Sequence, residues 1–401
     1  MHEPSIVHMD LDTFFVSVER LRDSRLEKKP ILIGGTSDRG VVAACSYEAR
    51  KFGIHSAMPM KLALQLCPEA VQIKGSHADY SKFSDMVCEI IREEVPVFEK
   101  TSIDEFYADL TGMDRFFGCF KLATELREKV IKETKLPISF GLSKNKTVSK
   151  VATGEAKPNN KLWIEMGKER PFLAPLSVKK IPMIGDKTYQ TLAGLGVRKV
   201  KTLQEMPKDM LRQIFGKNGV TMWEKANGID HSPVVPYSDR KSISTERTFD
   251  KDTTDVTMLK QIILAMTEHL AFQLREENKL TACVAIKIRY SDFNTYTQQI
   301  RIPYTSADHI LIPKIAELFD KLFDKRLLVR LVGVRFSSIV HGNYQINLFE
   351  DTGEIINLYQ AMDAMRQKHG DRMIVRAKAL GVSAMRTFNP FKGDMRVSKV
   401  A

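Results

Sequence analysis

The hydrophobic positions in the first 160 residues predict a sheet with helices packed on it. Ile6 to Leu11 is an apolar run of strand type, and Phe14, Phe15, Val18 and Leu21 follow it at helical spacing. Further strands are expected at 30–34, 41–47 and 138–143, and another at residue 104. A strand is thus followed directly by a helix near the start of the chain.

Two longer amphipathic helices are expected in the same region. Ser76 and Asp79 form a capping box, and the apolar positions from Tyr80 to Ile91 follow the helical period. A second apolar stripe runs from Phe116 to Val130 and stops before Pro137. We expect both helices to cover one face of the sheet.

The second half of the chain predicts a separate α+β unit after a proline-containing linker. Its elements are a helix near 256–276, strands at 280–290 and 295–303, a helix near 309–323 and a strand at 328–340. Val284, Ile286 and Ile288 alternate with more polar positions that include Lys287 and Arg289. One face of this sheet should therefore be basic.

Carboxylates stand beside apolar residues at two places, and these are the strongest chemical signal in the chain. Asp10 lies at the end of the first strand, and Asp104 and Glu105 follow another apolar run. Burying such charges is costly unless a cation compensates for them. Bunched carboxylates suit hard divalent metals, and a pair of such metals suits in-line phosphoryl displacement.

Two details of these carboxylates depend on local geometry. Asp12 is in phase with Asp10 along the strand, but it can also cap the following helix, and we favour the cap over metal binding. Asp104 and Glu105 are neighbours, so a regular strand would point them to opposite faces. Both can reach one metal cluster only if a turn or bulge lies there.

With these strings, His8 to Phe15 and Ser102 to Glu105, the chain resembles the Y-family DNA polymerases over about residues 5 to 350, and specifically their DNA polymerase IV branch. The resemblance implies an α+β multidomain fold of the right-hand type and low-fidelity translesion DNA synthesis without proofreading. The implied parts are a palm at 1–12 and 76–167, small fingers at 13–75, a helical thumb at 168–232, a linker at 233–241, a little finger at 242–341 and a tail at 342–401.

The resemblance also assigns roles at the carboxylates, with two Mg²⁺ ions, or Mn²⁺ in their place. Asp10 and Asp104 would bind both metals, Leu11 would contribute its carbonyl, and Glu105 would bind on the side of the primer 3′-OH. Phe15 would be the steric gate, an aromatic ring that collides with a ribose 2′-OH. Without the motif, Phe15 would be read equally well as a core aromatic.

Five residues would contact the incoming deoxynucleoside triphosphate. They are Phe14, Phe15, Tyr47, Arg50 and Lys157. An arginine fork and a tyrosine hydroxyl are suitable donors to phosphate oxygens, and a lysine can neutralise the pyrophosphate leaving group. Relatives commonly have threonine where this chain has Ala44, so one triphosphate contact is in doubt.

The predicted DNA contacts lie in the later domains. The segment from Lys180 to Lys187 resembles a helix-hairpin-helix, in which backbone N–H groups bind phosphate, and Gly185 and Lys187 are its candidate DNA-binding residues. Met183 replaces the first glycine of the hairpin. In the little finger, the candidates for primer–template DNA are Arg247 and Arg330.

A short peptide after the little finger resembles the segment by which bacterial polymerases dock on the sliding clamp. Gln345, Leu348 and Phe349 would enter pockets of the clamp β subunit, and tethering would improve processivity. The alternative interpretation is the end of a strand. Beyond it, an apolar stripe from Ile355 to Met365 predicts a helix in the tail.

The charge distribution fits a nucleic-acid enzyme, but basic helical faces are more often simply solvated. The net charge is +12, and residues 168–232 contribute 12 basic against 6 acidic residues, which suits a grip on a polyanion. The five cysteines have no C-x-x-C spacing, so we expect free thiols. No apolar run is long enough to span a membrane and the N-terminus lacks signal-peptide character, so we expect a cytoplasmic protein. We also expect it to be a monomer.

Two other functions compete with an independent polymerase. A non-catalytic DNA scaffold would keep the fold and lose the acids, whereas this chain retains all three. A catalytic subunit that is silent without accessory proteins, as in the polymerase V branch, is the second alternative. Primer extension by the isolated chain distinguishes them.

Overall fold

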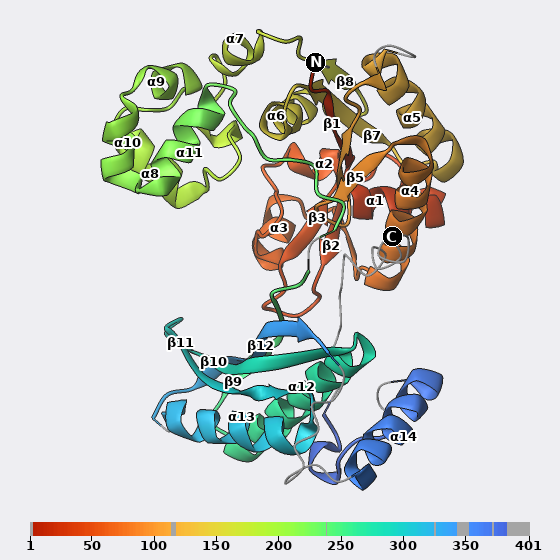
Figure 1. The fold of residues 1–401 in the computed structure, drawn as a ribbon, viewed down its shortest axis with the longest axis vertical. Coiled ribbons are helices and arrows are strands. Elements are labelled where there is room, and N and C mark those ends of the chain that lie inside the picture. Colours follow the sequence, from red (N-terminus) through yellow and green to blue (C-terminus); the bar gives the residue numbers. More distant parts are fainter. Residues whose placement is uncertain are drawn as a thin grey trace. The chain divides into compact units, whose positions relative to one another are not determined.

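The computed structural model describes residues 3–113, 118–237, 239–324, 326–342, 353–370 and 373–382. The chain divides into two compact units, and the described residues up to 237 form the first and those from 239 the second (Figure 1). The boundary falls inside the predicted linker. In the described residues, no helix is long and apolar enough to cross a bilayer. All five cysteines are free and buried, as expected.

A five-stranded sheet organises the first unit, in the order β5-β6-β1-β7-β8. The strands are β1 (Ile6–Leu11), β5 (Val97–Lys100), β6 (Glu105–Asp109), β7 (Ile138–Ser143) and β8 (Lys161–Trp163). The central strand β1 is antiparallel to both β6 and β7. Segments far apart in the sequence therefore lie side by side in the middle of the sheet.

Helices cover both faces of this sheet. On one face, α4 (His77–Glu94) and α5 (Cys119–Thr134) pack on Val7, Met9 and Leu11 in the main core, which confirms the prediction for these two helices. On the other face lies α6 (Lys146–Ala156), where Thr153 hydrogen-bonds His8. Alternation along β1 thus separates an apolar face from the face that carries Asp10.

A small second sheet follows, in the order β3-β2-β4. Its strands are β2 (Ile31–Gly34), β3 (Val42–Cys45) and β4 (Val71–Ile73), and the helices around it are α1 (Phe14–Arg22), α2 (Tyr47–Arg50) and α3 (Met60–Leu66), with a 3₁₀ turn η1 (Ser24–Leu26). Its core is small and separate from that of the five-stranded sheet.

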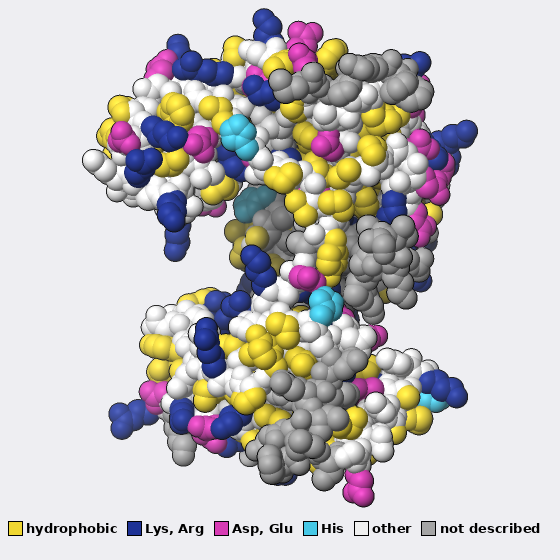
Figure 2. Space-filling model, viewed as in Figure 1, with side chains coloured by type: hydrophobic (Ala, Val, Ile, Leu, Met, Phe, Trp, Pro, Cys, Tyr) yellow, Lys and Arg dark blue, Asp and Glu magenta, His cyan; other side chains and the backbone are white. Residues whose placement is uncertain are grey.

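The rest of the first unit is helical. It contains α7 (Glu169–Leu173), η3 (Val178–Lys180), α8 (Asp186–Gly194), α9 (Val200–Glu205), α10 (Lys208–Phe215) and α11 (Lys217–Ala226). Helices α10 and α11 approach closely at Gly219, where a Cβ would lie 2.0 Å from the Leu211 carbonyl oxygen. Lys and Arg side chains, dark blue, are visible over these helices in Figure 2, and exposed examples are Lys187, Arg198 and Lys217.

The second unit is a four-stranded antiparallel sheet, in the order β11-β10-β12-β9, with two helices on one face. Its elements are β9 (Ser242–Thr253), α12 (Val256–Glu276), β10 (Lys279–Tyr290), β11 (Thr295–Thr305), α13 (Asp308–Leu322) and β12 (Val329–His341). Val284, Ile286 and Ile288 are buried against the helices, as the alternation predicted. The predicted element bounds agree with the observed ones to within two residues.

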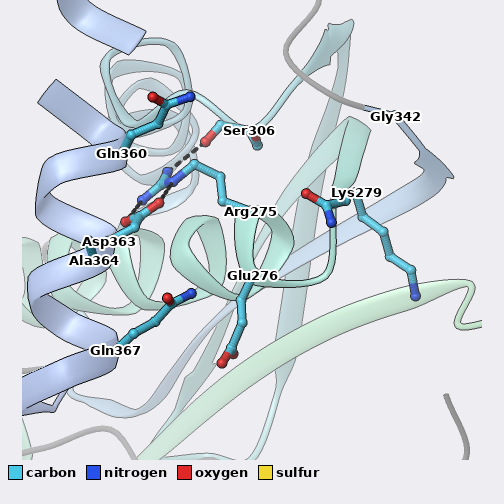
Figure 3. A pocket seen from close by; sticks show the side chains of 10 residues that line it. Arg275, Glu276, Lys279, Ser306, Gly342, Gln360, Asp363, Ala364 and Gln367 are labelled. Atoms are coloured by element: carbon cyan, nitrogen blue, oxygen red, sulfur yellow. Dashed lines mark hydrogen bonds and ion pairs between the residues drawn. The ribbon is translucent and has the colours of Figure 1, made fainter. Parts of the chain in front are cut away.

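The tail contributes the predicted helix α14 (Gly353–His369) and a 3₁₀ turn η4 (Ala377–Ala379), but the helix does not pack through its apolar stripe. Leu358 and Met365 are exposed, whereas Tyr359 and Arg366 are buried. Asp363 pairs with the buried Arg275 of α12 (Figure 3). The pocket beside this pair is lined by Glu276, Asn278, Lys279, Gln360 and Gln367 among others.

Candidate active site

The three predicted acids lie at one end of the five-stranded sheet. Asp10 of β1 is directly opposite Glu105, the first residue of β6, so the two side chains share a face. Asp104 precedes the strand in a bend, and its carbonyl accepts from the Leu11 amide at 3.0 Å. The predicted turn, without which the neighbouring Asp104 and Glu105 could not reach the same site, is therefore present.

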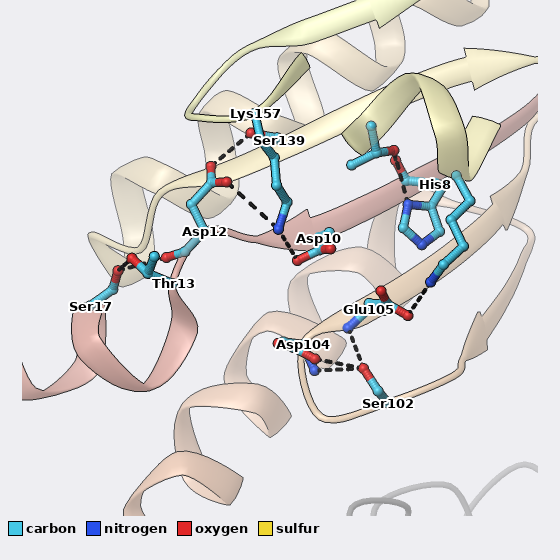
Figure 4. Close-up of polar contacts among 12 residues, drawn as sticks. His8, Asp10, Asp12, Thr13, Ser17, Ser102, Asp104, Glu105, Ser139 and Lys157 are labelled. Carbon is cyan, nitrogen blue, oxygen red and sulfur yellow. Dashed lines mark hydrogen bonds and ion pairs between the residues drawn. The ribbon is translucent and has the colours of Figure 1, made fainter. Parts of the chain in front are cut away.

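Each acid has its own polar partner (Figure 4). Lys157 Nζ donates to Asp10 Oδ1 at 2.5 Å, and Ser102 Oγ donates to Asp104 Oδ1 at 2.6 Å. Ser102 Oγ also accepts from the Glu105 amide, which closes the bend. In the described residues no three His, Cys, Asp or Glu side chains are grouped closely enough to hold one metal ion. The acids instead face separate partners.

Electrostatics nevertheless favour a cation at this end of the sheet. Burial raises the pKa of Asp10 to about 7, Lys157 lowers it, and the charges of Asp104 and Glu105 raise it. Burial also raises the pKa of Asp104, while Ser102 lowers it. The side-chain atoms available to a metal are all carboxylate oxygens, which hard divalent ions prefer as ligands. The Lys157 ammonium at Asp10 shows that this position already accommodates a positive charge.

Asp12 does not cap the following helix, so the prediction of a cap is wrong. The N-cap of α1 is Thr13, which has a left-handed backbone (φ 42°) and makes no capping bond with its side chain. Asp12 is 2% exposed, and its carboxylate accepts from the Tyr47 hydroxyl, the Ser139 hydroxyl and the Asn159 amide. It therefore connects three segments around the site.

The predicted gate residue is held by other aromatic rings. Phe15 stacks on Tyr80 with ring centroids 4.2 Å apart and meets His77 edge-on. Tyr80 is itself fixed, because its hydroxyl donates to Glu19 at 2.7 Å. Phe14 is buried in the main core, so a contact from it to a nucleotide would come from its backbone.

The predicted triphosphate ligands Tyr47 and Arg50 lie on the short helix α2. Ser46 caps this helix, and the Arg50 guanidinium lies 5.1 Å from the centre of the Tyr47 ring. Burial, followed by the charge of Asp12, raises the pKa of Tyr47, so its hydroxyl remains a donor. Ala44, where relatives commonly have threonine, packs against a small hydrophobic cluster that contains Ile31 and Ile33.

Comparison with known proteins decides the family. Residues 9–154 match the impB/mucB/samB family and residues 240–348 match its C-terminal domain. A DNA polymerase IV of Dehalococcoides mccartyi is 37% identical over 91% of this chain and 95% of its own length, and one of Treponema denticola is 32% identical over 94% and 97%.

The chain belongs to the Y family of DNA polymerases. It is a DNA-directed DNA polymerase of the DNA polymerase IV branch, which implies translesion synthesis, binding of primer–template DNA and deoxynucleotides, and use of divalent metals. A solved Y-family DNA polymerase chimera aligns over 84% of this chain and all of its own, with 25% identity and a TM-score of 0.73. DinB from Sulfolobus solfataricus shares the fold, at a TM-score of 0.59.

In the predicted thumb, the departure at Met183 does not remove the turn before α8. Met183 has φ 84° and thus takes the left-handed conformation that glycine takes most easily. Gly185 is extended and precedes α8, whose first turn has no side-chain cap, and Lys187 is exposed there. Backbone amides and a cation are therefore available at this helix start.

In the second unit, the predicted little finger, the two predicted DNA contacts lie in different surroundings. Arg330 lies in a bulge of β12, with its guanidinium 4.5 Å from the centre of the exposed Phe293 ring. Arg247 is paired in register with Val332, a residue of the helix-covered core, so it lies on the covered face. Arg247 therefore does not share the open face with Arg335, and its contact with DNA stays a prediction.

Several residues of functional interest were missed by motif reasoning. Arg301 and Arg335 are exposed on the open face of the four-stranded sheet, opposite Cys283 and Ala285 of β10. Their alternation with apolar residues along the strands could have predicted that they lie on the open face. The partners Ser139 and Lys150 become visible only through three-dimensional contacts. The predicted clamp residues Gln345, Leu348 and Phe349 lie outside the described residues.

Proposed function

We propose that the chain performs low-fidelity translesion synthesis by two-metal nucleotidyl transfer with Mg²⁺, without proofreading. The observation that carries this proposal is the meeting of Asp10, Asp104 and Glu105 at one end of the sheet, although 94 residues separate Asp10 from Asp104 in the sequence. Asp10, the Leu11 carbonyl, Asp104 and Glu105 would hold the ions. Once bound, two Mg²⁺ ions would lower the pKa of the primer hydroxyl and neutralise phosphate charge.

The chain's own residues bind and orient the nucleotide. Tyr47 and Arg50 are the first and last residues of the short helix α2. Lys157 lies between Asp10 and Asp12, with its ammonium 3.8 Å from the Asp12 carboxylate. The Lys157 ammonium would exchange its contact with Asp10 for the triphosphate, which leaves Asp10 able to bind a cation. Asp12 would keep Tyr47 oriented through the hydroxyl bond of 3.2 Å.

The active site would select sugars by shape and check base pairs weakly. The Phe15 ring is fixed by its stack on Tyr80, so it can reject a ribose 2′-OH by collision. The fingers are built on a three-stranded sheet and short helices, which offers little surface to test base-pair geometry. The sequence shows no second acidic motif of exonuclease type.

We also propose that the polymerase, acting as a monomer, is recruited by the bacterial sliding clamp. The support is the sequence alone, Gln345 to Phe349 directly after the little finger. A tether of this kind raises the effective concentration of the enzyme at the primer end.

Primer extension with Mg²⁺ tests the proposal on plain and lesion-bearing templates. Asp104→Ala should abolish incorporation, by at least roughly 10³-fold, because the transition-state charge loses its cation partners. DNA binding, measured by fluorescence anisotropy, should change little. Asp109→Ala is the matched control, since Asp109 is the carboxylate at the far end of β6. Incorporation by a clean Asp104→Ala preparation would contradict the assignment.

A further inference from the structure

Helix α6 presents a row of lysines to the five-stranded sheet. Lys146 and Lys150 lie one turn apart on the helix, and Lys157 follows directly after its last residue. Each of the three contacts a different acid of the sheet. Lys157 contacts Asp10 and belongs to the proposed nucleotide site. Lys150 contacts Glu105, and no role has been assigned to it so far.

The contact between Lys150 and Glu105 is short and specific. Lys150 Nζ donates to Glu105 Oε2 at 2.6 Å. Glu105 is the first residue of β6, directly after the bend closed by Ser102. A glutamate has three rotatable side-chain bonds, so its carboxylate needs a partner to stay in one place. The bond uses one oxygen, and the other is still available as a ligand.

Stability does not explain this ion pair. The side chains of Lys150 and Glu105 are 34% and 26% exposed, and pairs with this much solvent access contribute about 1 kcal/mol or less. The backbone of Glu105 is already fixed by its register with Asp10. What the pair adds is the orientation of the carboxylate.

We propose that Lys150 is a positioning residue for nucleotidyl transfer, which holds the Glu105 carboxylate in the orientation that binds the divalent ion. The inference rests on the proposed role of Glu105 as a metal ligand. Lys150 does not contact nucleotide in this scheme and acts through Glu105. Loss of such partners of metal ligands typically costs 10–100-fold in metal affinity or activity.

Four variants distinguish a positioning role of Lys150 from a general effect of charge or of folding. Lys150→Met should lower kcat about 10–100-fold with the KM for deoxynucleotide nearly unchanged, whereas Lys157→Met should raise KM. Lys150→Arg keeps a charged donor and should recover most of the rate. Lys146→Met removes the same charge from the same helix, but its partner is Glu99, so its kcat should match that of the unmodified enzyme. Thermal melting checks that each variant is folded.

A second measurement needs no turnover. On primer ended by a dideoxynucleotide, with deoxynucleotide present, electron paramagnetic resonance measures Mn²⁺ binding. Lys150→Met should weaken it about tenfold and Lys146→Met should not. Adding Lys150→Met to Glu105→Ala should cause no further loss, because the effect passes through Glu105.

The results identify which claim fails. Unchanged kcat and unchanged or tighter Mn²⁺ binding in Lys150→Met, or failure of Lys150→Arg to recover the rate, would overturn the positioning role. If Glu105→Ala itself keeps full activity, the proposed metal site is wrong. An inactive Glu105→Ala beside a normal Lys150→Met rejects only the role of Lys150.

Discussion

At the scale of single residues, the sequence identifies the acids of the site but not the residues that each of them contacts. Asp10, Asp104 and Glu105 could be selected because acids beside apolar strands need a cation. Asp12 was wrongly predicted to be the helix cap, because its spacing fits both a cap and a metal ligand. The left-handed backbone of Thr13 removes the cap and turns Asp12 toward Tyr47, Ser139 and Asn159.

Phe15 gives a prediction at this scale. Phe15→Ala should raise ribonucleotide incorporation by roughly 100-fold relative to deoxynucleotide, the size of selectivity that one shape contact supplies. Loss of the stack on Tyr80 should also cost about 1 kcal/mol of stability. Phe15→Tyr is the control and should keep sugar discrimination. Single-nucleotide kinetics with both sugars measure the effect, and unchanged selectivity in Phe15→Ala would remove the gate assignment.

At the scale of elements, hydrophobic periodicity predicted well which helices and strands form and where they end. It predicted less reliably which face of each element is buried. The alternation along β10 correctly separated its buried and open faces, because one face of that strand meets two helices. The apolar stripe of α14 predicted a helix but not its contacts. The buried Arg275–Asp363 ion pair and the buried Tyr359 attach this helix, whereas Leu358 and Met365 of the stripe are exposed. Sequence spacing cannot show which residue of α14 pairs with Arg275.

This attachment of α14 can be tested. Arg275 is 4% exposed and is held by Asp363 and Asp308, so Asp363→Ala should destabilise the second unit by about 3 kcal/mol, near the lower end for a broken buried pair because Asp308 remains. Hydrogen exchange of the α14 amides in the full chain measures this. Glu354→Ala, an exposed change in the same helix, should have no effect. Slow exchange in Asp363→Ala would show that other contacts hold the helix.

At the scale of the whole molecule, charge indicated a polyanion partner without locating the surface. Net charge of +12 and the basic segment 168–232 suggested DNA. The register of β9, β10 and β12 then excluded Arg247 from the open face and added Arg335. Register depends on pairing between distant strands, so motif positions alone could not supply it.

Clamp recruitment is the prediction at this scale. Adding the bacterial β clamp should lengthen primer extension products at least about tenfold, because tethering converts rebinding into an intramolecular step. Phe349→Ala should remove this stimulation and leave extension without the clamp unchanged. Asn347→Ala, in the same peptide, is the control. Equal stimulation of the Phe349→Ala enzyme would reject the docking peptide.

The central claim is that Asp10, Asp104 and Glu105 bind a pair of divalent ions. The most direct measurement is anomalous scattering from Mn²⁺ in crystals of the polymerase with dideoxy-terminated primer–template and deoxynucleotide. We predict two manganese peaks in contact with Asp10 and Asp104, one of them also bound by Glu105. Crystals with ordered nucleotide and no manganese at these carboxylates would contradict the account.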